Sequence, residues 1–439
     1  MNVERTGPVT HGQLSVLRSL ESYGTTGQAV ANLVSIWDIP AGASVAHAAD
    51  AWQQLVTAHE SLRTVYSTGH ERPAQSVLAP RAASVPAVEV PDATHGATRD
   101  LAATWAAEPL DIRQGPPWRA FVAVHRGAPL YLVTVIHHIA ADNTALHILR
   151  EQFERLAMGE VLGPQEQPVD LALAQLEDGD DSRAVRHWSR HWDGFSPEDR
   201  QEGDVSVRRR ATLHSVEGLR AAGHVSRRAG VSLQTVVLAV GAVALARVRR
   251  RDRITFGLMA ANRLDERWSS LVSSLNQCVP LSVRVDEEAA PDDFLRTTYQ
   301  TSMNAYLYGC FDVDVLKRDL NESGRRETDP TFFSSHYNFL GPGDGEPPLD
   351  SPLRTGCVWR ASTQRIGPNF HLAVAVESGI LIGVGASVDF LPGDLPAVLA
   401  ASIEGGLVAL ADEPPESLRE LRLAPCRDIG RSSSSRVPN

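Results

Sequence analysis

A predicted buried strand that runs directly into a polar turn and a helix limits the folds that this sequence can adopt. Residues 130–136 (LYLVTVI) are rich in β-branched residues and apolar on both faces apart from Thr134, as is typical of a strand covered on both sides. Apolar residues then repeat at helical spacing and predict a helix over about residues 143–158. The residues between them, 137–143, read HHIAADN. The pattern predicts a mixed α/β fold with polar side chains at a strand-to-helix turn.

Two adjacent histidines, His137 and His138, follow this strand directly. Neighbouring side chains at a strand end point to opposite sides, so we expect one imidazole to be available for chemistry and the other to be structural. Asp142 falls at the start of the helix, where free N–H groups and the helix dipole favour a carboxylate. A tight turn would return Asp142 to the histidines. A neutral histidine can accept a proton from an attacking nucleophile near pH 7.

Three simpler interpretations of these residues remain open at this point. A metal site is disfavoured, because the rings of His137 and His138 diverge and no third strong ligand lies nearby in the sequence. The histidines alone are also consistent with hydrogen-bonded polar groups at a buried strand end. Asp142 is consistent with a helix cap and nothing more. The spacing by itself therefore does not assign an enzyme.

The 439 residues suggest two or three domains, or two large lobes, at a prior of roughly 150 residues per domain. A polar, Gly- and Pro-containing region over about residues 159–210 predicts a surface connection between an N-terminal lobe, residues 1–175, and a C-terminal lobe, residues 176–426. We expect the serine-rich tail, residues 427–439, to be disordered. Further α/β elements are predicted as helices over residues 233–248 and 292–307 and strands over residues 253–258 and 380–387.

Composition excludes several classes of function. The net charge of -11 disfavours binding to nucleic acid, which needs clustered cations. The four cysteines have no CxxC spacing, so neither a disulfide framework nor a zinc ribbon is expected. The start lacks the apolar segment of a signal peptide, and the longest apolar run, residues 236–246, is too short to span a bilayer. The expected location is the cytoplasm, without membrane contact. No phosphate-binding loop for ATP is found.

The HHIAADN segment resembles the HHxxxDG signature of the condensation-domain superfamily. That superfamily includes nonribosomal peptide synthetase condensation domains, polyketide-associated acyltransferases and chloramphenicol acetyltransferase. The resemblance runs from about residue 7 to about residue 400, and HESLRT together with HHxxxD is a specific combination. The other matching segments, in the expected order, are residues 10–13 (THGQ), 58–66 (AHESLRTVY), 109–120 (PLDIRQGPPWRA), 255–263 (TFGLMAANR) and 276–281 (NQCVPL).

The resemblance implies an α/β fold, an α+β sandwich in each lobe, with two chloramphenicol-acetyltransferase-like lobes arranged as a V-shaped pseudo-dimer around a tunnel. It implies that His138 lies nearest the reacting atoms, where it accepts the proton of the nucleophile or positions the nucleophile and stabilises the tetrahedral intermediate. His137 and Asp142 would complete the catalytic motif as structural members. Arg263 would pair with Asp142, which is sound because a buried carboxylate needs a partner with several donors.

The sequence departs from the family pattern at the last position of the motif, where Asn143 replaces glycine. Glycine allows an unusual backbone angle, and asparagine is the best substitute in a left-handed conformation, although its side chain adds bulk beside the tunnel. Asn276, Tyr337 and Asn338 are expected to line the tunnel. Residues 336–341 (HYNFLG) resemble a motif of epimerisation domains, but the segment that supplies their second base has no counterpart, so epimerisation is not expected.

The resemblance therefore implies a free-standing, monomeric condensation enzyme of specialised-metabolite biosynthesis. It would transfer an acyl group from a phosphopantetheine thioester on a carrier protein, supplied in trans, to an amine or an alcohol. No covalent acyl-enzyme is expected, because no nucleophile is paired with His138 in the motif. No metal and no permanently bound cofactor are expected, since the pantetheine arm belongs to the carrier protein. Two alternatives are an acyltransferase that uses coenzyme A and a catalytically silent module that recruits another enzyme.

Overall fold

The protein is described by a computed structural model that forms two compact units, each treated separately below. The expected tail, residues 427–439, lies outside the described residues. Unit 1 comprises Met1–Arg186, Ala261–Gln277 and Cys310–Glu322, and unit 2 comprises His187–Ala260, Cys278–Gly309 and Ser323–Asn439. The structure describes residues 2–22, 29–68, 72–177, 179, 182–192, 207–325, 329–331, 333–342, 356–361, 367–376 and 378–423.

These boundaries differ from the expected single break after residue 175. Two segments from the second half of the sequence belong to unit 1 because their contacts are made there. Helix α10 (Val313–Glu322) contacts α1 (His11–Ser22), where Arg18 forms an ion pair with Asp314 at 2.7 Å. The lobes are therefore not two contiguous halves of the chain.

Unit 1 contains a four-stranded sheet in the order β2-β7-β6-β5, in which only β5 and β6 are parallel among the described strands. Its bounds are β2 (Asn32–Asp38), β5 (Ala87–Glu89), β6 (Trp118–His125) and β7 (Ala128–His137). Helices α2 (Val45–Ala58) and α4 (Asn143–Ala157) pack with β6 and β7 in one core cluster, and α3 (His95–Ala106) contacts β2 and β7 in another. The predicted buried strand and the helix after it are thus confirmed as β7 and α4.

A second sheet of unit 1 has the order β1-β4-β3, with the bounds β1 (Val3–Pro8), β3 (Thr64–Ser67) and β4 (Ala74–Leu78). The remaining helices are α5 (Pro168–Glu177) and α6 (Arg183–His191), and α6 lies at the unit boundary.

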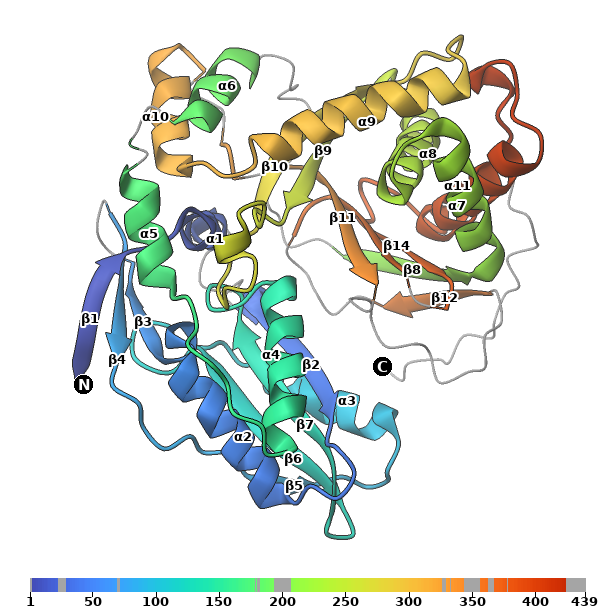
Figure 1. Cartoon of the computed structure of the whole chain (residues 1–439). Coiled ribbons are helices and arrows are strands. Elements are labelled where there is room, and N and C mark those ends of the chain that lie inside the picture. Colours follow the sequence, from blue (N-terminus) through green and yellow to red (C-terminus); the bar gives the residue numbers. More distant parts are fainter. Residues whose placement is uncertain are drawn as a thin grey trace. The chain divides into compact units, whose positions relative to one another are not determined.

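Unit 2 is built on a seven-stranded mixed sheet covered on one face by helices (Figure 1). The strand order is β10-β9-β11-β13-β14-β8-β12, with β11 parallel to both of its neighbours. The predicted helices and strands of this half are confirmed as α8, α9, β9 and β14. The bounds are β8 (Arg208–Ser215), α7 (Val216–Ala229), α8 (Leu233–Arg249), β9 (Arg253–Ala260), β10 (Gln277–Arg284), α9 (Pro291–Leu307), β11 (Ser335–Pro342), β12 (Gly356–Ala361), β13 (Phe370–Val376), β14 (Ile380–Ser387) and α11 (Leu395–Asp412).

Helix α11 is long and apolar enough to cross a membrane by length and composition alone, and so is the bent pair of α7 and α8. In the structure α11 contacts α7, α8, β8 and β14. These contacts bury α11 against the sheet and its neighbouring helices, and a helix that is apolar all round is stable when it is buried.

Candidate active site

His137 ends strand β7, and its ring is used to hold the turn that follows. The side chain is buried, and its Nδ1 accepts a hydrogen bond of 3.1 Å from the backbone N–H of Ile139. Burial lowers the pKa of His137 to about 3, so the ring is neutral at neutral pH. Since Nδ1 is the acceptor, the proton lies on Nε2. His137 therefore has a structural role in the turn.

His138 is partly exposed, and it is hydrogen-bonded to a serine from a distant segment. Its Nδ1 lies 3.4 Å from Oγ of Ser274, and Ser274 in turn donates its hydroxyl to Oδ1 of Asn276 at 3.0 Å. A hydroxyl has one proton, so Ser274 accepts at its contact with His138. We assign the ring proton to Nδ1 on this basis. The lone pair of Nε2 is then left to accept a proton.

The electrostatic surroundings keep His138 in this neutral form. Burial lowers its pKa from the ordinary 6.5, while a hydrogen bond to its own backbone and the charge of Asp142 act in the opposite direction. The net shift is downward. His138 is therefore a neutral imidazole at neutral pH, which is the state a general base requires.

Asp142 connects the turn to a second segment of the chain. Its Oδ1 accepts from the N–H of Ala145, which caps α4, and from Nη2 of Arg263 at 2.8 Å. Its Oδ2 accepts from the N–H of Leu275 at 3.0 Å. The side chains of Asp142 and Arg263 are 3% and 7% exposed. The predicted ion pair is confirmed, and Arg263 also donates to the carbonyls of Trp268, Ser269, Leu271 and Ser273.

The contact between Asp142 and Leu275 fixes the position of the neighbouring Ser274 beside His138. The start of α1 supports the same segment from the other side. A Cβ atom on Gly12 would lie 2.3 Å from the carbonyl oxygen of Ser274, so only glycine allows this approach. Nε2 of Gln13 donates to Oγ of Ser273 at 3.2 Å. These contacts explain why residues 10–13 (THGQ) are among the segments that match the family pattern.

Sequence reasoning missed Ser274. Residues 273–276 read SSLN, and the sequence pattern predicted no contact between these residues and His138. Asn276, expected in the substrate tunnel, is placed near His138 through Ser274.

Asn143 corrects one expectation. It is the first residue of α4, and it is absent from the residues with positive φ in the described chain. Asn143 therefore does not adopt the left-handed conformation in which asparagine best replaces glycine, because Asp142 caps the helix and Asn143 is its first residue. A left-handed asparagine does occur at Asn262, with φ of 53°, and its Nδ2 donates to the carbonyl of Leu275 at 3.0 Å. The unusual backbone angle thus lies in the loop that carries Arg263.

Tyr337 and Asn338 belong to strand β11 of unit 2. Tyr337 is 1% exposed, and its hydroxyl donates to the carbonyl of Gln234 in α8 at 2.7 Å. Its side chain therefore packs toward the helices, and the prediction that it lines a tunnel is wrong. Asn338 points to the opposite face of the sheet, because side chains alternate along a strand, and it is partly buried.

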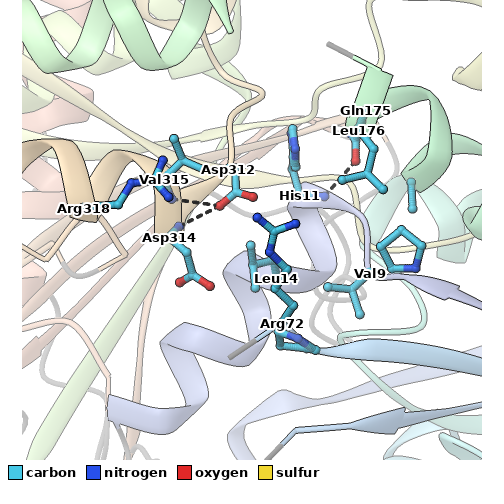
Figure 2. A pocket seen from close by; sticks show the side chains of 13 residues that line it. Val9, His11, Leu14, Arg72, Gln175, Leu176, Asp312, Asp314, Val315 and Arg318 are labelled. Atoms are coloured by element: carbon cyan, nitrogen blue, oxygen red, sulfur yellow. Dashed lines mark hydrogen bonds between the residues drawn. The ribbon is translucent and has the colours of Figure 1, made fainter. Parts of the chain in front are cut away.

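A separate cavity of about 330 Å³ lies in unit 1 beside the start of α1 and α10 (Figure 2). The backbone N–H of His11 donates to Oε1 of Gln175 at 2.9 Å, and Oδ1 of Asp312 accepts from the N–H groups of Asp314 and Val315. Its polar groups thus cap and connect local elements. In the described part of the chain, no cluster of three or more His, Cys, Asp or Glu could hold a metal ion.

The strand-turn-helix site agrees with the comparisons to known proteins. The family model described as "Condensation domain" matches residues 32–339. The chain therefore belongs to the condensation-domain family, whose members are acyltransferases that form amide bonds.

Malpibaldin synthetase of Mortierella alpina is 25% identical over 316 residues, which cover 64% of this chain and 6% of that protein. The chain thus spans a small part of this curated relative. Among solved structures, the condensation domain of the monacolin K polyketide synthase MokA has a TM-score of 0.77 at 15% identity, covering 95% of this chain and all of that one. The first condensation domain of the CDA synthetase has a TM-score of 0.73 at 16% identity, covering 96% and 99%. These likenesses establish the fold.

Proposed function

We propose that this protein transfers an acyl group from a carrier-bound phosphopantetheine thioester to an amine or an alcohol. The observation that carries the proposal is the neutral imidazole of His138, whose Nδ1 is engaged by Ser274 and whose Nε2 lone pair is left to accept a proton. Membership of the condensation-domain family supports the same chemistry.

In the proposed reaction, Nε2 of His138 accepts the proton of the attacking amine or hydroxyl as its N or O atom bonds to the thioester carbonyl. The tetrahedral intermediate then collapses, and the C–S bond breaks. The imidazolium of His138 returns the proton to the departing thiolate of the pantetheine arm. Product, free thiol and neutral histidine result, so atoms and charges balance.

We propose a direct transfer without an acyl-enzyme. Ser274 provides a hydroxyl that contacts His138 in the described site, but it lies at Nδ1 and donates its proton to Asn276. An activated serine nucleophile instead donates its proton to the histidine. Ser274 therefore suits the role of a positioning residue.

The proposal assigns the phosphopantetheine arm to the carrier protein and requires no resident metal or cofactor. It includes a carrier supplied in trans and a product of the amide or ester class in specialised-metabolite assembly. The similarity to malpibaldin synthetase and to a condensation domain of a polyketide synthase supports this setting.

The test mixes the full chain with carrier proteins loaded with acyl-phosphopantetheine and with a panel of amines and alcohols. Intact-protein mass spectrometry follows the loss of the acyl group from the carrier. The same acyl group on coenzyme A is the second donor. Faster turnover with the acyl-coenzyme A would show that coenzyme A, and not the carrier protein, supplies the acyl group. No turnover with any donor, together with capture of a further enzyme, would favour a silent recruitment module.

A further inference from the structure

Unit 2 carries basic side chains on the face of its sheet that is turned away from the helices. Leu372 of β13 points toward the helices, since a Cβ atom on Gly241 of α8 would lie 2.7 Å from its Cδ2. Side chains alternate along a strand, so the preceding residue, His371, points to the opposite face. This face is partly exposed at His371.

The register places four residues in one row across this face. His336 of β11 pairs with His371 of β13, His371 pairs with Gly385 of β14, and Gly385 pairs with Arg210 of β8. Paired residues of adjacent strands share a face, and Arg208, two residues before Arg210, shares it too. Because Gly385 has no side chain, it leaves space between the histidines and the arginines.

A cavity of about 180 Å³ occupies that space. Among the described residues that line it, none is Asp or Glu. The lining residues are Arg208, Arg209, Arg210, His336, Pro368, His371 and Gly385.

Two of the cations are held in place by the protein. Arg208 is 9% exposed and donates to the carbonyls of Gly367, at 3.3 Å, and Pro368. Arg209 lies nearer the outside, with Nη1 3.9 Å from Oδ1 of Asp394, so its charge is partly balanced.

The two histidines add no charge to the cavity. Burial lowers the pKa of His336 to about 4 and that of His371 to about 3, and the charges of Arg208 and Arg210 contribute to the lowering at His371. Both rings are neutral at neutral pH, and a neutral ring has one N–H. The ring of His336 forms a hydrogen bond with the backbone of Phe333, so His371 is the ring that we take as a donor to a ligand. Guanidinium groups beside neutral imidazoles favour an anion and repel a cation.

We propose that this cavity of unit 2 binds the anionic group of a small ligand, a carboxylate or a phosphate monoester, with Arg208 and Arg210 as the charged donors and His371 as a neutral donor. The inference rests on unit 2 alone and does not depend on the role of His138. If acyl transfer is the function, the anion has two possible sources: the phosphate of the pantetheine arm, or a carboxylate on the acyl group or the nucleophile.

The test titrates the full chain with four probes in a calorimeter: 4′-phosphopantetheine, pantetheine, inorganic phosphate and succinate. Arg210→Gln should weaken binding of the anionic probes about tenfold or more, as expected for a hydrogen bond to a charged group. Arg296→Gln, at an exposed position of α9, is the matched control and should leave binding unchanged. Arg208→Gln is a second variant, and thermal melting checks that each variant is folded.

The probes distinguish the two sources of the anion. Binding of 4′-phosphopantetheine but not pantetheine supports the phosphate, and stronger binding of succinate than of inorganic phosphate supports a carboxylate. His138→Gln should keep the binding intact, so loss of acyl transfer and loss of anion binding are separable. Absence of binding by every anionic probe, or binding unaffected by folded Arg210→Gln and Arg208→Gln proteins, would overturn the inference.

Discussion

Nη2 of Arg263 lies 2.8 Å from Oδ1 of Asp142, and the two side chains are almost fully buried. This pair joins the start of α4 to a segment 121 residues further along the chain. Because Asp142 also accepts from the N–H of Leu275, the pair fixes the adjacent Ser274 beside His138. Asp142 thus acts by holding the neighbouring residues of the site in position.

Removal of the Asp142 carboxylate should destabilise unit 1. Asp142→Ala leaves the Arg263 cation buried without its partner and removes the cap of α4, and breaking such a pair costs about 3–5 kcal/mol. The measurement is urea unfolding followed by tryptophan fluorescence. Asp293→Ala breaks the exposed pair with Arg296 and serves as the control, with an expected change of about 0.5 kcal/mol or less. Equal stability of the two variants would contradict the structural role of the buried pair.

Ser274→Ala tests whether Ser274 orients His138. The variant loses one acceptor for Nδ1–H, so we expect kcat to fall about fivefold and KM to change little, since a lost hydrogen bond costs about 1 kcal/mol. Ser269→Ala, at an exposed serine of the same segment, is the control. Complete loss of activity, together with an acyl adduct on Ser274 in the parent protein, would instead indicate a covalent mechanism.

Gly12→Ala tests the close approach of α1 to the serine segment. The added methyl would overlap the backbone carbonyl of Ser274, which cannot move without breaking the contact between Leu275 and Asp142. We expect a loss of stability of about 1–3 kcal/mol and a parallel loss of activity. The control is Gly115→Ala, where the nearest atom lies 3.9 Å from the new Cβ. A fully active and stable Gly12→Ala protein would show that the segment is not fixed in this way.

The pH dependence follows from the lowered pKa values of the two histidines. His138 must be unprotonated to accept a proton, and burial lowers its pKa, so kcat/KM should fall only below about pH 6.5 and be constant from pH 7 to 8. A midpoint well above pH 7 would contradict a buried neutral base.

His137 should make stability depend on pH. Its folded pKa of about 3 lies below its unfolded value of 6.5, so the unfolded chain binds a proton that the folded protein excludes. The stability contributed by neutral His137 is complete above pH 6.5 and is lost as the pH falls toward 3. Urea unfolding at a series of pH values should show a weaker dependence for His137→Gln over this range than for the parent chain.

The sequence predicts local features of the site well. The strand, the helix and the cap at Asp142 follow from periodicity and from residue types within about thirty positions. The pair with Arg263 was predicted only through resemblance to a family, because no local rule connects residues so far apart in the chain.

Errors arose where tertiary contacts decide between two local choices. Both faces of the HYNFLG strand carry large side chains, and the carbonyl of Gln234 in α8 determines that Tyr337 faces the helices. Asn143 stands where the family pattern has a glycine that allows an unusual backbone angle, but the cap from Asp142 places Asn143 in the helix. Ser274 could not be predicted, since its contact with His138 depends on how Asp142 holds Leu275.

His138 is the residue that we propose accepts the proton of the nucleophile. The most direct measurement compares single-turnover transfer from a loaded carrier by the parent chain, by His138→Gln and by His224→Gln, which alters an exposed histidine of α7. We expect the rate to fall about 10²–10⁴-fold in folded His138→Gln and to be unchanged in His224→Gln. An undiminished rate in His138→Gln would contradict the proposal.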